Sequence, residues 1–494
     1  MPPRLFRPRP RGSKEALNFM SSPHRNLIVP LVIACALFME QIDGSIIATA
    51  LPRISQSLQT DPVHLNLAIT CYMFSLAVFI PLSGWIADRF GARNIFRLAI
   101  LVFVLGSIAC GLSNDLKELV LARVLQGAGG AMMVPVGRLI LLRTVPKAYL
   151  VDAMAWMVAP AMIGPVLGPP VGGIIVTYAS WRWIFFINVP IGILGYLLST
   201  RYIENIRGRK REPLDFLGFV LVALSLSGLM FGFEAVGREV VPIPVICGVV
   251  SAGILSFILY LLHMRRITCP IIDLRTLQYQ TYRASLTGGS LFRVAIGALP
   301  FLLPLLLQYG FGLSPAMSGF TTLASAVGAF TMKIWARSVI RAVGFRRILI
   351  ANTALSAFFL GGCAFFTRES PLWFIFAFLL VGGFFRSLQF TALNTIAYAE
   401  VPEYMLARAN TLYTMVQQLS LSLGVAVGAL ALNLTLGWHG SAALEVRDFW
   451  PAFIGVAALC QFAVIAFIPL ARDAGAVISG HNLPAHEAEH KDPA

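Results

Sequence analysis

Charged residues are scarce in this chain of 494 residues. Asp, Glu, Lys and Arg make up 12% of it, whereas hydrophobic residues make up 57%. Soluble globular domains contain roughly 25% charged residues. The shortage excludes an ordinary soluble domain and indicates a protein that crosses a membrane many times.

The sequence also lacks the patterns of an enzyme or a metal protein. Its seven cysteines include no Cys-x-x-Cys pair and no metal-ligand spacing, so we interpret them as small core residues. No Gly-x-x-x-x-Gly-Lys-Ser/Thr loop occurs, which excludes the usual ATP-driven mechanism. Because there is also no nucleophile–base pair, we expect no catalytic residues, no metal and no cofactor. Three histidines near the C-terminus (481, 486 and 490) fit a solvated tail better than a metal site.

Long apolar runs fill most of the chain. A membrane-spanning helix needs about 20 mainly apolar residues. Fourteen segments meet this requirement: 27–51, 64–87, 95–113, 117–142, 150–177, 182–203, 214–236, 242–264, 283–309, 315–336, 347–367, 371–395, 405–436 and 449–471. The sequence therefore predicts an all-α integral membrane protein, with no room for a soluble domain.

The basic residues indicate how the chain lies in the membrane. With the N-terminus inside, 27 of the 38 Lys and Arg residues fall on cytoplasmic segments and six on outer loops. This asymmetry follows the positive-inside rule and predicts that both termini are cytoplasmic. It also explains the formal net charge of +15 without a nucleic-acid partner.

A short loop pattern occurs twice. Gly91-Ala-Arg93 follows the second span, and Gly344-Phe-Arg346 follows the tenth. Many secondary transporters are built from internal repeats and bind substrate between them, near the bilayer midplane. We therefore divide the chain into an N-terminal tail (1–26), a six-helix half (27–203), two inserted helices with flanking loops (204–282), a second six-helix half (283–471) and a C-terminal tail (472–494).

Three stretches combine small residues with charge in a way that has a physical use. "GWIADRFGAR" after span 2 forms a tight turn, with Asp88 available for an arginine or a helix N-terminus. "LARVLQGAGG" in span 4 carries Arg123 and Gln126, which are followed by a face of small residues. "GPVLGPPVGG" in span 5 predicts a bent helix that packs closely on its neighbours.

Together these stretches resemble the fourteen-helix drug:proton antiporter family of the major facilitator superfamily. Four stretches carry the resemblance: the loop motif Gly84, Asp88, Arg89, Gly91 and Arg93; the span 4 motif Arg123, Gln126 and Gly127; the antiporter motif Gly164, Pro165, Gly168, Gly172 and Gly173; and "DGSIIATALP" from Asp43 to Pro52. "GGAMMVPVGR" and "WRWIFFINVPIG" are most similar to the MdtD-type subgroup of multidrug-resistance exporters. The resemblance implies two pseudo-symmetric halves, a gating role for the loop motif, and proton coupling at Asp43.

Charged residues inside the spans are costly and must face the bundle interior or a water-filled cavity. Glu40 and Asp43 share one face of span 1, and the helix rise places them at a depth similar to that of Arg123. One interpretation is a structural ion pair with Arg123. The other, which we favour, is a titrating site in which a proton or a cationic substrate replaces Arg123 as the partner of the carboxylate. The resemblance favours Asp43 over Glu40, which is an additional acid.

Arg293 lies in the first span of the second half, as Glu40 and Asp43 lie in the first span of the first half. The helix rise places it at about the midplane. It either bonds to a backbone carbonyl or to Glu40, or it binds an anionic group of the substrate. By contrast, Arg138 and Lys333 fall near the inner ends of their spans, where we expect them to snorkel. The predicted lining of the substrate cavity is Arg293, Gln126, Trp156, Phe301, Gln308, Arg386 and Asn394.

The sequence thus predicts a proton-coupled exporter of amphipathic drugs or toxic small molecules in the bacterial inner membrane, working by alternating access. An exporter of a small organic anion or a metal-chelate metabolite is the alternative, and a membrane sensor without transport is less favoured. Its expected partners are a small-molecule substrate, protons and the lipid bilayer, and we expect a monomer.

Overall fold

The structure is a computed structural model, and it describes residues 25–60, 62–208, 213–236, 241–439, 445–479 and 481. Within these ranges the chain forms helices joined by short connections and contains no strand. Most of the predicted tails, 1–24 and 482–494, lies outside the described residues, including His486 and His490.

The first half of the chain forms one group of helices. They are α2 (Arg25–Ser57), α3 (Pro62–Phe79), η1 (Ile80–Leu82), α4 (Ser83–Phe90), α5 (Ala92–Leu112), α6 (Leu116–Thr144), η2 (Lys147–Tyr149), α7 (Leu150–Tyr178), α8 (Trp183–Phe186) and α9 (Asn188–Tyr202). Helix α2 packs along α7, and α6 packs against α3 and α5. We call this group the N-half.

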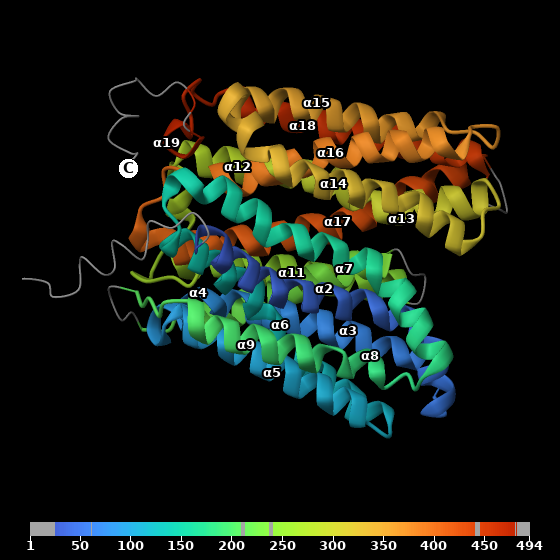
Figure 1. The fold of residues 1–494 in the computed structure, drawn as a ribbon, viewed down its shortest axis with the longest axis horizontal. Helices are drawn as coiled ribbons and strands as arrows, with labels where there is room; N and C mark the ends of the chain where they lie inside the picture. Colours follow the sequence, from blue (N-terminus) through green and yellow to red (C-terminus); the bar gives the residue numbers. More distant parts are fainter. Residues whose placement is uncertain are drawn as a thin grey trace, which may run out of the picture.

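The last part of the chain forms the second group, the C-half. Its helices are α12 (Gln280–Gly297), α13 (Leu299–Leu305), the π-helical turn η4 (Leu306–Gly310), α14 (Pro315–Val343), α15 (Phe345–Gly362), η5 (Cys363–Phe365), α16 (Leu372–Ile396), η6 (Glu403–Met405), α17 (Leu406–His439) and α18 (Val446–Phe467). Figure 1 shows α5, α6 and α9 on one side of the bundle and α15, α16 and α18 on the other.

The predicted inserted helices are α10 (Phe216–Val236) and α11 (Ile243–Met264), followed by η3 (Leu274–Gln278). Helix α10 packs on α3 of the N-half and on α17 of the C-half, while α11 packs along α10. The pair therefore lies against the seam between the halves. A short final helix, α19 (Ala476–Ser479), contacts α7 and α14.

The repeated loop pattern takes the same shape in both halves. Gly91 ends α4 and precedes α5 with φ +96°, and Gly344 stands between α14 and α15 with φ +82°. Both values lie in the region that favours glycine. We use "predicted inner end" for the end of the bundle that carries these two turns, which is the left side of Figure 1.

Twelve helical stretches in the described residues are long and apolar enough to cross a membrane. They correspond to twelve of the fourteen predicted spans. The other two predicted spans coincide with α7 and α14, which are helices of 29 residues each. The all-helical membrane fold is thus observed, while the count of fourteen spans stays a prediction for α7 and α14.

Candidate functional site

A buried ion pair lies in the middle of the N-half. Asp43 of α2 and Arg123 of α6 are 1% and 0% exposed, and Arg123 Nη1 donates to Asp43 Oδ2 over 2.7 Å. The sequence placed these residues at a common depth, and the structure brings their charged atoms together. A charged pair buried so completely needs further hydrogen bonds to offset its desolvation.

Those hydrogen bonds come from two amide side chains. Gln126 Nε2 and Asn188 Nδ2 both donate to Asp43 Oδ1, over 2.8 and 2.9 Å. Gln126 Oε1 accepts from Arg123 Nη1 over 2.7 Å. Gln126 was predicted to line the substrate cavity, and it lies fully buried among these charges. The four residues, which we call the Asp43 cluster, join α2, α6 and α9.

Sequence reasoning missed Asn188. It lies in the "FFINVPIG" stretch, whose resemblance to known exporters was the only available signal. Its amide also donates to Ser107 Oγ on α5 over 2.9 Å, and that hydroxyl donates to the Phe185 carbonyl. The carboxylate of Asp43, on α2, is therefore held by a network that reaches α5, α6, α8 and α9.

Tyr72 of α3 was missed as well. The guanidinium carbon of Arg123 lies 4.2 Å from the centre of its ring, a favourable distance for a cation over an aromatic face. Among the described residues, the buried Tyr72 hydroxyl has no hydrogen-bond partner, and neither do Nε and Nη2 of Arg123. The network thus has spare donors around one carboxylate.

Glu40 is placed differently from Asp43. Its side chain is half-buried, and in the part of the chain that the structure describes the buried Oε2 atom has no hydrogen-bond partner. Among the described residues it forms no ion pair with Arg123 or Arg293. Its free carboxylate oxygen can accept a proton without breaking an existing contact.

Arg293 of α12 lies inside the C-half and is fully buried. Its Nη2 donates to Asn394 Oδ1 of α16 over 3.4 Å and to the hydroxyl of Tyr413 on α17. Two predicted cavity residues, Arg293 and Asn394, are thereby in contact. Tyr413 was not predicted, although it is the closest polar partner of Arg293.

Two basic residues contradict the expectation that they snorkel. Arg138 is 1% exposed and donates to Thr414 Oγ1 and Gln417 Oε1 of α17, in the other half. Lys333 is 4% exposed, and its Nζ donates to Thr391 Oγ1 over 2.7 Å. Depth along a helix does not reveal whether a side chain points to lipid or to a neighbouring helix, which is why the prediction was wrong.

The remaining predicted cavity residues are spread over α7 and the C-half. Trp156 of α7, Phe301 of α13 and Gln308 of the π-helical turn are half-buried. Arg386 of α16 is buried and donates to Ser325 Oγ of α14. None of the predicted cavity residues lines the cavity at the predicted inner end that is described below.

Small residues of the predicted antiporter motif allow α7 to lie against α2. A Cβ atom at Gly164 would come within 2.7 Å of Gln41 Cβ, and one at Gly168 would overlap Ser45. Ser45 Oγ also donates to the Gly164 carbonyl over 3.2 Å. Gly172 is buried, whereas Gly173 has open space beside it. The side-chain surroundings of Pro165 lie outside the described residues.

The loop motif occupies the predicted inner end. Arg143 of α6 donates to Asp88 Oδ1 over 2.5 Å, Arg93 Nη1 donates to the Ile203 carbonyl, and Arg89 lies over the ring of Trp85. Gly84 approaches α17 so closely that a Cβ atom would lie 2.5 Å from Thr411 Oγ1. The motif therefore ties α4 to its own half and presses it against the other.

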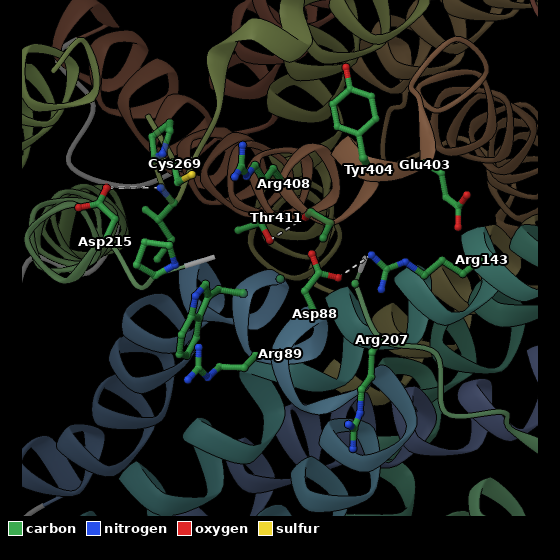
Figure 2. Close-up of a pocket in the computed structure, with 17 residues that line it drawn as sticks. Asp88, Arg89, Arg143, Arg207, Asp215, Cys269, Glu403, Tyr404, Arg408 and Thr411 are labelled. Atoms are coloured by element: carbon green, nitrogen blue, oxygen red, sulfur yellow. Dashed lines mark hydrogen bonds and ion pairs between the residues drawn. The ribbon is translucent and has the colours of Figure 1, made fainter. Parts of the chain in front are cut away.

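A cavity of about 540 Å³ lies beside this motif. Figure 2 shows Asp88 and Arg143 directed toward each other, with Thr411 and Arg408 of α17 nearby and Asp215, at the start of α10, on the far side. Its walls thus come from both halves and from the segments that flank the inserted pair. Its polar groups include acids and arginines, and Arg408 already pairs with Asp273.

Hydrogen bonds between the two halves gather at the predicted inner end. Arg337 of α14 pairs with Asp152 of α7 over 2.9 Å, and Asn410 Nδ2 donates to the Pro135 carbonyl over 2.6 Å. Lys147 Nζ reaches the Ala399 carbonyl over 3.3 Å. Together with the contacts of Arg138, these bonds hold the halves together at that end.

Comparison with known families decides the identity of the fold. The profile of the Major Facilitator Superfamily matches residues 33–266 and 285–483. The chain belongs to this superfamily of transporters. A multi-pass membrane transporter is therefore established, in agreement with the resemblance of the motifs.

Relatives within the superfamily cover most of the chain. A protein of Escherichia coli O6:H1 (strain CFT073), provisionally named multidrug resistance protein MdtD, is 37% identical over 447 residues, which are 89% of this chain and 94% of the relative. The protein of the same name from Shigella sonnei (strain Ss046) is 38% identical over 83% of this chain and 87% of its own length.

Two solved structures share the fold. The human organic anion transporter MFSD10 has a TM-score of 0.66 and 14% identity, covering 90% of this chain and all of its own. The proton:xylose symporter XylE, solved with 6-bromo-6-deoxy-D-glucose, has a TM-score of 0.62 and 14% identity, covering 92% and 97%. At this identity the likeness concerns the fold alone.

Proposed function

We propose that this protein is a proton-coupled antiporter that exports amphipathic drugs or other toxic small molecules across the bacterial inner membrane by alternating access. The observation that carries the proposal is the Asp43 cluster, a fully buried carboxylate held by one arginine and two amides in the middle of a transporter half. An ionisable residue at this depth is a functional candidate by default.

The cluster supplies a way to exchange partners. While Asp43 is ionised, it accepts three hydrogen bonds, from Arg123, Gln126 and Asn188. Protonation removes the charge that Arg123 requires, so the three donors must rearrange. A cationic substrate can replace the arginine in the same way. Glu40, three residues away with a free oxygen, is the second acid through which a proton passes.

The driving force is sufficient for transport. Moving one elementary charge across 100 mV is worth about 2.3 kcal/mol. Contacts at the predicted inner end, such as the pair between Asp152 and Arg337, must break when that end opens. The side chains of Arg337 and Asp152 are 39% and 28% exposed, so this pair is weak enough for such a drive to overcome.

The expected arrangement of the chain completes the proposal. The predicted N-half, inserted pair and C-half act as the moving parts, both termini are cytoplasmic, and the transporter works as a monomer. The proposal assigns protons and a small molecule as the transported species, without a cofactor.

A second candidate function is the export of a small organic anion. One specific observation favours it: Arg293 is fully buried and is bonded only to neutral groups among the described residues. A buried cation without a counter-ion is unfavourable unless a ligand supplies the charge.

The proposed function is tested with the purified protein in proteoliposomes. An imposed pH gradient drives uptake of labelled cations, anions and zwitterions into vesicles whose internal pH is followed by a dye. We expect substrate movement coupled to proton movement in the opposite direction, and both must stop when an ionophore collapses the gradient. Substrate transport that continues without the gradient, or proton leakage without substrate, refutes proton antiport.

A further inference from the structure

Two buried arginines from opposite halves lie on the same tyrosine ring. The guanidinium carbon of Arg138, on α6, is 5.4 Å from the centre of the Tyr413 ring. That of Arg293, on α12, is 4.7 Å from it. Both arginines are almost inaccessible, at 1% and 0% exposure. The ring of Tyr413 therefore lies next to two cations, one from each of the two moving parts of the transporter.

The N-half arginine is bonded to neutral groups. Arg138 Nη1 donates to Thr414 Oγ1 over 3.3 Å and Nη2 to Gln417 Oε1 over 3.2 Å. Both bonds are long, and the buried Nε atom has no hydrogen-bond partner among the residues that the structure describes. Within the described ranges no carboxylate pairs with this guanidinium.

The C-half arginine has the same deficit. Arg293 Nη2 donates to Asn394 and to the Tyr413 hydroxyl, and the buried Nε and Nη1 atoms have no hydrogen-bond partner within the described ranges. That hydroxyl lies 3.2 Å from Ser285 Oγ. As with Arg138, no carboxylate of the described chain neutralises the charge.

Comparison with Arg123 shows what is missing. Arg123 is as deeply buried as these two residues, and Asp43 lies 2.7 Å from it. A buried charge is tolerated when it is paired and hydrogen-bonded. Two cations that lie near one ring and have no carboxylate partner among the described residues also repel each other, and the low dielectric of the interior strengthens the repulsion. An anion between them would remove both costs.

We propose that Arg138 and Arg293 bind the anionic group of the exported substrate against Tyr413, so that the transported class includes organic anions with a carboxylate or sulfonate on an aromatic body. The aromatic preference rests on Tyr282 and Tyr398, whose rings lie 6.3 and 5.6 Å from that of Tyr413. The proposal deepens the proposed function and rests on it for the direction of transport.

The site opens together with the predicted inner end. In this structure the bonds from Arg138 to α17 close the seam between α6 and α17, and the two arginines are covered. When the halves separate at that end, the same bonds break and the donors of Arg138 are released. An anion entering from that side meets donors from both halves, and it holds them together as the seam closes again.

Equilibrium binding to the full-length detergent-purified protein tests the site without a proton gradient. The probes are 2-naphthoate and 2-naphthamide, which share an aromatic body and differ in charge. The variants are Arg138→Gln and Arg293→Gln, with the lysine variants Arg138→Lys and Arg293→Lys to retain a charge. Arg97→Gln is the matched control, because Arg97 lies 4.4 Å from the ring centre of Tyr196 and bonds its hydroxyl, within the N-half.

We expect each glutamine variant to weaken naphthoate binding about tenfold or more, as loss of one partner of a buried charge pair does. The lysine variants should bind with intermediate affinity, and Arg97→Gln should bind as the wild type does. Naphthamide binding should change little in any variant. Equal losses for both probes, or no loss for naphthoate, overturn the proposal. Only the monodisperse fraction of each variant is measured. If the glutamine variants do not fold, the lysine variants decide. The proposal is then overturned if they no longer prefer naphthoate to naphthamide, or if they bind naphthoate as tightly as the wild type does.

A transport arm separates this proposal from the previous one. If naphthoate binds through the two arginines but a pH gradient drives the export neither of naphthoate nor of any cation or zwitterion, proton antiport fails and the anion site stands. If pH-driven export of cations is found and naphthoate does not bind, the anion site fails and the antiporter stands.

Discussion

Replacing Asp43 by asparagine tests whether the buried carboxylate is a proton carrier or only the counter-ion of Arg123. Asparagine has the same shape and carries no charge. Its single acceptor oxygen cannot serve both Arg123 and the two amide donors that now share the carboxylate over 2.7–2.9 Å. Whichever way the new amide is oriented, its NH₂ group faces a donor.

The structure sets the size of the expected effect. Arg123 is fully buried, so the variant leaves an uncompensated charge in the interior. Removing one partner of such a pair typically costs about 3–5 kcal/mol. We therefore expect Asp43→Asn to lower the thermal stability of the detergent-purified protein and to abolish efflux driven by a pH gradient in inverted vesicles.

The double variant Asp43→Asn/Arg123→Gln separates the two roles. It removes both charges and keeps polar side chains in place, and replacing a whole buried pair by neutral groups is often close to neutral for stability. We expect thermal stability to recover while pH-driven efflux stays lost. Recovery of efflux in the double variant would refute the reasoning, since the carboxylate would then be needed only to balance the arginine.

Four further substitutions test the gating and packing of the bundle. Asp88→Asn should slow turnover several-fold without changing the order of substrate preference in a transport panel; an altered preference contradicts a role confined to gating. Gly168→Val should destabilise the protein by about 1–3 kcal/mol through overpacking. Gly173→Ala should leave the melting temperature unchanged, because no atom lies near its added Cβ. Similar effects of the two substitutions would contradict the packing of α7 on α2. Asp152→Asn removes the ion pair with Arg337 and should increase cysteine labelling at the predicted inner end; unchanged labelling excludes this pair as a latch.

Several parts of the fold and the site could be predicted from the sequence because they depend on local composition. Apolar length marks a membrane helix wherever it occurs, and twelve of the predicted spans are observed in that way. The common depth of Asp43 and Arg123 followed from the fixed rise of a helix. Motif resemblance named the superfamily, which the family comparison confirms.

The direction of a side chain could not be predicted in the same way. Arg138 and Lys333 were expected to reach the membrane surface, yet both are buried against α17 and α16. A hydropathy pattern gives the depth of a residue and leaves open which neighbouring helix its side chain meets. Asn188 and Tyr413 escaped notice for a related reason, since one amide or hydroxyl in an apolar run carries no signal until its partner is known.

The sequence by itself determined that this protein is a polytopic transporter with two acids and one arginine at a common depth. Only the tertiary structure decided that Asp43, and not Glu40, holds Arg123, and that Arg138 and Arg293 meet at Tyr413 without a counter-ion from the described residues. The physical reason is that burial and hydropathy depend on single residues, whereas an ion pair or a binding site depends on which helices pack together.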